Sequence, residues 1–477
     1  MAPSALAPTG TPSPSLLREL TAEVARHAPF AQMAPEHVAQ FVAAATQVYH
    51  APGELVLGPQ SGTAGTLWLL RQGSILGAGG ASSGSTEPFE FVAGDMFPVG
   101  VVLAGRAVTS TYTAHGDSFS LALPTDEVQR LASAKQISTQ LSAAPDEAAL
   151  RHLARQIRQF ARHLLGQGVH ARQLTELISH LNDVLTEALL RLVAARCGMD
   201  LSRACWLAFG SEGRGEQTVA TDQDNGLVFV PQDPQQVREP ERAAWLAFAR
   251  EVNEALDDCG YPLCKGGVMA SNPACCLSPL EWTARFTQWV EGGTPDHLLQ
   301  ASIFFDLRPL CGNAALAAPL QSFLCTAPAH VPRFIKQMAD NALRRGAPLN
   351  WRGALATTDV KGQALLDLKL QGTAIFVDAA RLYALAHGLS ALGTRARLET
   401  AAPLIGVAPA EGDAWVAGFE FLQMLRLQLQ LGQRAAPADN PNAVDTLTLN
   451  DIERRMLKET MRMARSLQQR IQLDYGR

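Results

Sequence analysis

The chain has 477 residues, 47% of them hydrophobic, and a formal net charge of −5. This length exceeds the ~150 residues of a typical domain, so we expect several domains, with enough apolar residues for sizeable cores. The weakly acidic balance provides no overall basic field, which argues against nucleic acid as a partner and leaves phosphate binding to local groups. No uninterrupted run of 18 apolar residues occurs, so neither a transmembrane helix nor a membrane partner is predicted. The eight cysteines form no C-x-x-C pair, which indicates reduced thiols and a cytoplasmic location.

The first part of the chain predicts a tail followed by a β-rich domain. Residues 1–15 lack a basic start and an apolar centre, so they predict a disordered tail rather than a signal peptide. Residues 16–133 begin with two short helical patterns that end near Val48. Short strand candidates with Gly and Pro between them then predict a small β-barrel or β-roll. These candidates are residues 54–57, 65–70, 74–76, 89–92, 109–114 and 118–123.

This order of elements resembles cyclic-nucleotide-binding domains, through the segments APFAQM, YHAPGELVL, TLWLLRQGSIL and VAGDMFPVG. In those domains an arginine binds the cyclic phosphate and a glutamate binds the ribose. The resemblance implies phosphate contacts at Arg106 and Thr109, in the cassette after the turn at residues 97–100. No acidic residue stands at the ribose position, and an unpaired sugar hydroxyl would weaken binding by roughly a few kcal/mol. We therefore expect weak or absent cAMP binding, with a structural domain or a pocket for another small ligand as the alternatives.

A helical connector is predicted from residue 146 to residue 198. Apolar residues recur there at intervals of three and four, and Gly166 and Gly168 separate two helices. The pair Asn182-Asp183 falls in the second helix. For such a pair a solvated or capping role is more common than a catalytic one.

The central segment CWLAFGSEGRGEQTVATDQDNGLVFV, residues 205–230, contains two apolar runs that predict buried strands. Asp222 and Asp224 stand at the start of the second run. Strand residues two apart face the same side, so both carboxylates can point at one cation. Mg²⁺ is typically held by one or two carboxylates together with substrate phosphates, which predicts a metal site here.

A glycine-rich turn links the two predicted strands. Gly210, Gly213 and Gly215 let backbone N–H groups approach a ligand, while Ser211 and Arg214 provide further donors for phosphate oxygens. A phosphate-binding turn followed by paired carboxylates is what metal-dependent nucleotidyl transfer requires. Each motif alone is common, and the alternative for each is a solvated surface turn.

Gly210-Ser211 followed by Asp222-x-Asp224 resembles the signature of the DNA-polymerase-β-type nucleotidyltransferase superfamily. The string GSEGRGEQTVATDQDN is similar to a bacterial nucleotidyltransferase family of unknown function that is related to PII-protein uridylyltransferases. The segments GGVMASNP, SIFFDLRPL and LDLKLQGTAIFVDAARLYAL extend the similarity. The resemblance implies an NTP substrate, a Mg²⁺ or Mn²⁺ cofactor, and uridylyl- or adenylyl-like transfer to an acceptor, which could be a protein. Gln223 and Asn225 depart from the apolar residues usual in the superfamily, which could tune or alter the site.

Asp306 is the candidate for a third acidic residue, which the superfamily places on a later strand. It lies in the apolar run 302–307, which predicts a strand, and a buried carboxylate there needs a partner. We expect that partner to be the metal shared with Asp222 and Asp224. The alternative is a buried ion pair with an arginine such as Arg308.

Basic residues later in the chain are candidates for nucleotide contacts. Lys265 follows a predicted helix at residues 241–259 and could reach a triphosphate, or could lie on the surface. Lys369 and Arg381 fall in the most family-like segment, with nucleotide or acceptor contacts and surface or ion-pair roles as equal alternatives.

The predicted fold is multidomain α+β. It combines the N-terminal β-roll, the connector at 146–198, a polymerase-β-type α/β core at 199–325 and a helical bundle at 332–477. Periodic segments at 376–387, 415–431 and 452–473 predict helices in the bundle, with Asp451 as the cap of the last. We expect a metal-dependent nucleotidyltransferase regulated by its N-terminal domain. The competing hypothesis is a signal-transduction protein that binds a nucleotide without catalysis.

Overall fold

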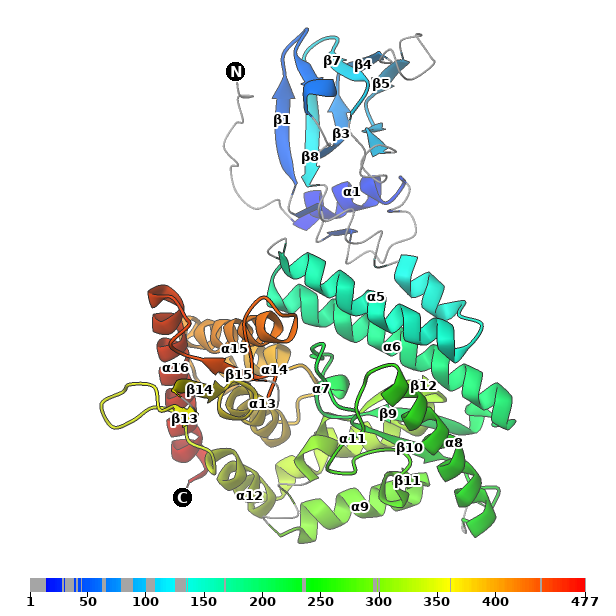
Figure 1. Cartoon of the computed structure of the whole chain (residues 1–477), viewed down its shortest axis with the longest axis vertical. Coiled ribbons are helices and arrows are strands. Elements are labelled where there is room, and N and C mark those ends of the chain that lie inside the picture. Colours follow the sequence, from blue (N-terminus) through cyan, green and yellow to red (C-terminus); the bar gives the residue numbers. More distant parts are fainter. Residues whose placement is uncertain are drawn as a thin grey trace. The chain divides into compact units, whose positions relative to one another are not determined.

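The computed structural model describes most of the chain, which divides into two compact units, residues 1–136 and 137–477. Figure 1 colours both units along the sequence. The described residues are 14–27, 30, 38–39, 42–43, 45–61, 66–78, 89–99, 108–124, 134, 136–166, 169–233, 237–294, 298, 301–360, 362–437 and 440–476.

The first unit consists of two antiparallel sheets, with strand orders β1-β8-β3-β6 and β2-β7-β4-β5. Side chains from both sheets and from α1 (Pro14–Val24) form one apolar core, which includes Val24, Leu69, Ile75 and Tyr112. The strands are β1 (Thr46–His50), β2 (Leu55–Leu57), β3 (Thr66–Gln72), β4 (Ser74–Ala78), β5 (Phe89–Val92), β6 (Met96–Phe97), β7 (Thr111–Ala114) and β8 (Ser118–Pro124). The predicted β-rich fold is confirmed.

Two expectations for this unit were wrong in detail. The segment expected to end a helical pattern near Val48 is strand β1, whose five residues all pair with β8. Helix α1 begins at Pro14, so the last two residues of the predicted tail 1–15 belong to a helix. Residues 1–13 lie outside the described part of the chain.

A four-stranded sheet of order β11-β10-β9-β12 lies at the centre of the second unit. Strands β10 (Asn225–Phe229) and β12 (Arg308–Gly312) pair antiparallel with β9 (Ala204–Ala208), and β11 (Cys276–Leu277) pairs parallel with β10. Successive side chains alternate between the two faces of the sheet. Leu207 and Val228 therefore enter one apolar core, and Trp206 and Leu227 enter another.

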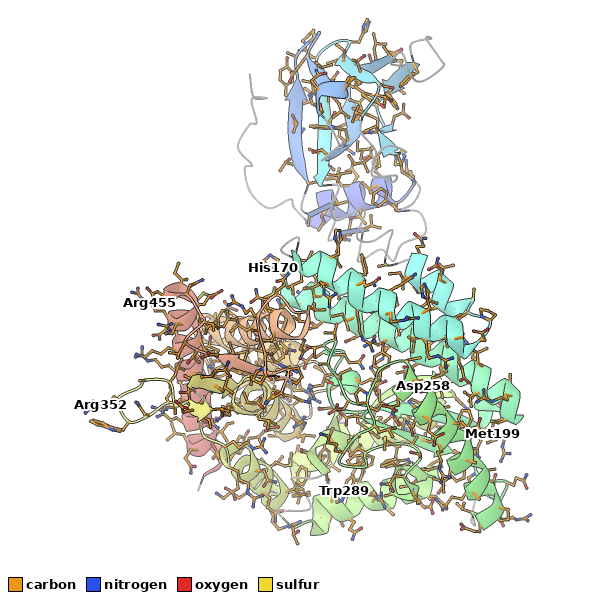
Figure 2. All side chains as sticks on the ribbon, viewed as in Figure 1. His170, Met199, Asp258, Trp289, Arg352 and Arg455 are labelled. Atoms are coloured by element: carbon orange, nitrogen blue, oxygen red, sulfur yellow. The ribbon has the colours of Figure 1, made fainter. Side chains whose placement is uncertain are left out.

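Helices cover both faces of this sheet (Figure 1). Side chains of α5 (Glu147–Gly166), α6 (Ala171–Cys197) and α8 (Glu239–Asp258) share the core of Trp206. Those of α9 (Pro279–Gly292) and α11 (Ala318–Thr326) share the core of Leu207. Figure 2 draws the side chains between these elements, and its labels His170 and Met199 flank α6. The connector helices and the α/β core are thus as predicted.

The C-terminal part is the predicted helical bundle, with a small sheet that was not predicted. Its core residues join those of α9 and α11 in one continuous cluster, so the bundle packs directly on the α/β core. Asn450 rather than Asp451 caps the last helix, through a capping box with Glu453. The elements are α12 (Pro332–Leu343), β13 (Thr358–Val360), β14 (Gln363–Asp367), a π-helix (Lys369–Thr373), α13 (Ala374–Ala386), α14 (Thr394–Leu404), α15 (Pro409–Gln430), β15 (Ala443–Asp445) and α16 (Asp451–Tyr475). None of the described helices has the length and apolar character that a membrane span requires.

Candidate functional site

The turn after β9 forms a four-residue helix, α7 (Gly210–Gly213). Gly210 has a φ of 52°, and a Cβ atom there would lie 2.8 Å from Oδ2 of Asp224. A Cβ atom on Gly213 would overlap the carbonyl oxygen of Asp306. Both positions therefore need glycine, the first to leave room beside Asp224 and the second to pack α7 closely on the core.

Asp222 and Asp224 lie in the extended segment immediately before β10, next to the α7 turn. The backbone N–H of Phe209 donates to the carbonyl oxygen of Asp224 at 2.8 Å, which joins this segment to the end of β9. Asp222 is exposed, Asp224 is half-buried, and both line one cavity together with Gly210 and Ser211. The structure thus brings the predicted aspartates and the predicted turn together.

The electrostatics of this pair suit a bound cation. Burial raises the pKa of Asp224 to about 6, while the hydrogen bond to Cys264 and the charge of Lys369 act in the opposite direction. Two carboxylates beside a cleft kept open by Gly210 are a donor set that fits a hard divalent ion such as Mg²⁺ or Mn²⁺. No cluster of three or more His, Cys, Asp or Glu side chains suited to a metal occurs within the described residues.

Gln223 and Asn225 alternate with the aspartates and face a buried amide network. The amide of Gln223 donates to the carbonyl oxygens of Asn253 and Tyr261, at 2.9 and 2.8 Å. Asn253 donates to Gln223 Oε1 at 2.8 Å and to Asn225 Oδ1 at 3.0 Å. The polar residues that depart from the superfamily pattern therefore anchor the aspartate segment to α8 and to the following loop.

The pair Asn182-Asp183 also takes part in the interior, so the solvated or capping role expected for it was wrong. Asn182 is 4% exposed and accepts a hydrogen bond from the hydroxyl of Tyr261 at 2.6 Å. Asp183 forms an ion pair with Arg308 at 2.9 Å. Their helical position concealed this role, because Tyr261 and Arg308 are distant in sequence.

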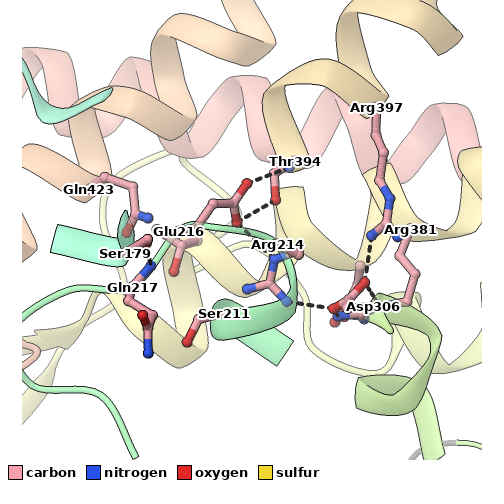
Figure 3. Close-up of polar contacts among 12 residues, drawn as sticks. Ser179, Ser211, Arg214, Glu216, Gln217, Asp306, Arg381, Thr394, Arg397 and Gln423 are labelled. Carbon is pink, nitrogen blue, oxygen red and sulfur yellow. Dashed lines mark hydrogen bonds and ion pairs between the residues drawn. The ribbon is translucent and has the colours of Figure 1, made fainter. Parts of the chain in front are cut away.

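Asp306 does not join the two aspartates, and the structure favours the alternative of a buried ion pair. Its segment, Ser302–Asp306, is a 3₁₀-helix and not the predicted strand. Its carboxylate is fully buried and accepts from Arg214 at 2.6 Å, Arg381 at 2.7 Å and Arg397 at 2.6 Å (Figure 3). Arg308, the partner suggested from the sequence, pairs with Asp183 instead. Burial alone would raise the pKa of Asp306, but Arg381, Arg397 and Arg214 together hold it well below its usual range.

Arg214 connects this cluster to a second carboxylate, which alters its predicted role as a free phosphate ligand. Its Nε donates to Glu216 at 2.8 Å while its Nη1 bonds Asp306. Glu216 also accepts from the hydroxyl of Thr394 at 2.9 Å, at the start of α14 (Figure 3). The α7 turn is thus held to the C-terminal bundle by a chain of charged side chains.

A cavity of about 320 Å³ joins these parts. The α/β core contributes Gly210, Ser211, Asp222 and Asp224 to its lining. The C-terminal bundle contributes Lys369, Thr373, Arg381, Gln423 and Arg426, among others. The cavity thus has two aspartates on the α/β core and basic residues on the bundle, an arrangement suited to a phosphorylated ligand with a bound cation.

Two family models match the chain, one over the α/β core with its preceding helices and one over the C-terminal bundle. The model described as "Putative nucleotidyltransferase DUF294" matches residues 155–296, and "Putative nucleotidyltransferase substrate binding domain" matches residues 332–475. The chain belongs to this DUF294 nucleotidyltransferase family. The cavity is lined by residues of both matched segments. No curated protein matches the chain.

Several solved structures are similar to the N-terminal region, at low identity. A cyclic nucleotide-binding-like protein from Brucella abortus is 12% identical, over 24% of this chain and 98% of its own, with a TM-score of 0.21. The sensor domain of the regulator DNR from Pseudomonas aeruginosa is 16% identical, over 27% and 91%, with a TM-score of 0.22. The regulatory domain of Toxoplasma gondii PKA, solved with cAMP, is 16% identical over 25% and 49%, with a TM-score of 0.21.

Four further residues predicted as ligand-binding are not among the described residues that line the cavity. Lys265 is exposed and Gly213 is buried, and neither lines the cavity. In the N-terminal unit, Thr109 is exposed, and Arg106 falls outside the described residues. The phosphate contacts expected of Arg106 and Thr109 therefore stay a prediction.

Two further residues that line the cavity, Gln423 and Arg426 on α15, were not predicted from the sequence. They interrupt the apolar pattern of a helix whose neighbouring residues are buried. A buried arginine in an apolar helix requires compensation, so this interruption was a signal that could have been used.

Proposed function

We propose that this chain is a metal-dependent nucleotidyltransferase that transfers a nucleoside monophosphate from an NTP to an acceptor hydroxyl. The observation that supports this most is the single cavity containing Gly210, Ser211, Asp222 and Asp224. Membership of the DUF294 family agrees with it. Asp222 and Asp224 would hold Mg²⁺ or Mn²⁺, which would neutralise phosphate charge and orient the substrates.

In this reaction the acceptor oxygen bonds to the α-phosphorus as the bond to the bridging oxygen breaks. Pyrophosphate leaves, and the acceptor proton is released to water. The residues of this chain position the reactants. Ser211 of the α7 turn lines the cavity, and the buried amide network keeps both aspartates beside it. Positioning and charge stabilisation are sufficient for a large rate enhancement in phosphoryl-type transfer.

We further propose that the acceptor is a protein and that the transfer is uridylyl- or adenylyl-like, as the resemblance to PII uridylyltransferases implies. The test uses each of four labelled NTPs with Mg²⁺ or Mn²⁺ and a cell lysate as acceptor. Label in an acid-precipitable band sensitive to phosphodiesterase is the expected result. Label confined to the small-molecule fraction would instead indicate a metabolite acceptor and reject the hypothesis of a protein acceptor.

A non-catalytic nucleotide-binding role is the second candidate. It is favoured by one observation: Asp306, the expected third acidic ligand, is fully committed to three arginines. If no labelled product forms with any nucleotide or metal while nucleotide still binds, this role replaces the catalytic one.

We propose that the N-terminal domain regulates the transferase and binds cAMP weakly or not at all. The missing acidic residue at the ribose position supports this expectation. Titration calorimetry with cAMP should detect no sub-micromolar binding. Tight binding that Arg106→Ala abolishes would make the domain a cyclic-nucleotide switch.

A further inference from the structure

The charged residues that line the 320 Å³ cavity fall into two groups, paired and unpaired. Arg214 and Arg381 line it, but both are ion-paired with Asp306. Lys369 and Arg426 also line it, and within the described residues no carboxylate forms an ion pair with either. Both of these cations come from the C-terminal bundle, whereas Asp222 and Asp224 come from the α/β core.

Arg426 is the more unusual of the two cations because it is buried. It is 7% exposed, and the side chains that accept its hydrogen bonds are the neutral amides of Asn442, at 3.0 Å, and Gln423, at 2.6 Å. Burial lowers the pKa of Arg426 to about 10. A guanidinium has five N–H donors, so these two bonds leave donors for a ligand in the cavity.

Lys369 is held at the cavity by the turn that precedes it. Its backbone N–H donates to Oδ1 of Asp367 at 2.8 Å, and that carboxylate also accepts from Leu370. Lys369 opens the π-helix Lys369–Thr373, a type of distortion that is frequent at functional sites. Its side chain is exposed and can therefore reach a ligand without the cost of burying a lysine.

We propose that Lys369 and Arg426 form a polyphosphate-binding pole that holds the β- and γ-phosphates of the NTP. This inference rests on the proposed function, in which Asp222 and Asp224 hold the metal in the same cavity. A triphosphate bridges a cation on one side and basic side chains on the other, so it suits a cavity with one acidic and one basic wall. The C-terminal bundle would thus recognise the leaving pyrophosphate, while the α/β core holds the metal.

The test measures binding to the full chain by titration calorimetry. The probes are the four Mg-NTPs, inorganic tripolyphosphate and the four nucleoside monophosphates. The variants are Lys369→Gln, Arg426→Gln and Arg426→Lys, with Lys458→Gln on α16, outside the cavity lining, as the matched control. Lys369 is exposed, so its variant should fold even if Arg426→Gln does not.

Loss of a charge-assisted contact should weaken NTP and tripolyphosphate binding about tenfold or more in Lys369→Gln and Arg426→Gln. Arg426→Lys should recover part of the loss, and monophosphate binding and the control should not change. Unchanged NTP and tripolyphosphate binding in both Gln variants would overturn the inference. Equal weakening of monophosphate binding would also overturn it.

The inference and the proposed function fail in different ways. If the parent chain binds NTP, the variants weaken that binding, and no labelled product forms, the phosphate pole stands and catalysis is rejected. If labelled transfer occurs and the variants bind NTP as the parent does, only the pole is rejected. A parent chain that binds neither NTP nor tripolyphosphate rejects both.

Discussion

At the scale of single residues, the two aspartates carry the metal hypothesis. Replacing either Asp222 or Asp224 with Asn removes a ligand charge, but it also relieves repulsion between neighbouring carboxylates in the metal-free protein. We therefore expect the affinity for Mg-NTP to fall by ~10–100-fold or more. Mutation of a residue that only hydrogen-bonds to a metal ligand already lowers metal affinity by that factor. Calorimetry with Mg-NTP measures the affinity, and chemical denaturation should show little change in stability.

The control for both variants is Asp340→Asn, on an exposed side chain of α12 that pairs only with Lys336 among its described neighbours. It removes the same charge at a position outside the cavity lining and should leave nucleotide binding intact. Parent-like affinity for Mg-NTP in both cavity variants would show that the metal site is misassigned.

Asp306 is expected to matter for stability rather than for metal binding. Asp306→Asn would leave the guanidinium groups of Arg381 and Arg397 buried without their shared carboxylate, which should cost about 3–5 kcal/mol of unfolding free energy. The lowered pKa of Asp306 means that its contribution is fully present above the unfolded pKa and is lost only as pH falls through the folded value. The cost measured by urea denaturation should therefore be the same at pH 6 and pH 8. An unchanged unfolding free energy in Asp306→Asn would contradict this role.

At the scale of elements, α8 positions the aspartate segment through one side chain. Asn253 bonds Gln223 and Asn225 and accepts from the backbone N–H of Ser271 at 3.1 Å. These bonds join α8, the segment before β10 and the loop after Tyr261. The proposed metal site therefore depends on a helix that does not line the cavity.

Asn253→Ala should leave several buried polar groups without partners and lower the unfolding free energy by about 2–4 kcal/mol. Because the aspartate segment loses its anchor, the KM for Mg-NTP should rise as well, even well below the denaturation midpoint. Glu254→Ala, at the next and exposed position of α8, is the matched control. An effect on stability without any effect on nucleotide affinity would show that the network does not position the site.

At the scale of the whole molecule, the transferase elements all belong to the unit of residues 137–477. That unit has its own apolar cores, and the N-terminal unit has a separate one. Regulation and chemistry are therefore expected to be separable. Testing this separation requires a shortened chain that lacks the N-terminal unit and keeps all residues of the cavity.

Deleting residues 1–131 should change the rate of labelled transfer while leaving nucleotide preference and metal dependence as they are in the full chain. Single-time-point labelling with each NTP measures preference, and a time course measures the rate. Asp222→Asn in the shortened chain provides the inactive control. Loss of activity in a folded shortened chain would mean that the N-terminal unit contributes to the site itself.

Local patterns in the sequence were sufficient for most elements and for the position of Asp222 and Asp224 beside the glycine-rich turn. Apolar runs and glycine positions predicted β9, β10 and the turn between them, and Asp222 and Asp224 were expected at the start of the second strand, which they immediately precede. These features depend on residues close together in the chain, where periodicity and turn chemistry act. The same holds for the helices of the connector and of the C-terminal bundle.

Only the tertiary structure decided what the other charged residues do, because their partners are remote. Asp306 meets Arg214 and Arg397 across 92 and 91 positions of sequence, so its isolation in an apolar run suggested a metal that the structure replaces with arginines. Lys369 and Arg426 reach one cavity only because a π-helix and α15 pack beside the α7 turn. Burial and pairing are properties of contacts between distant segments, so a local pattern such as the polar interruption of α15 can single out a residue but cannot identify its partner.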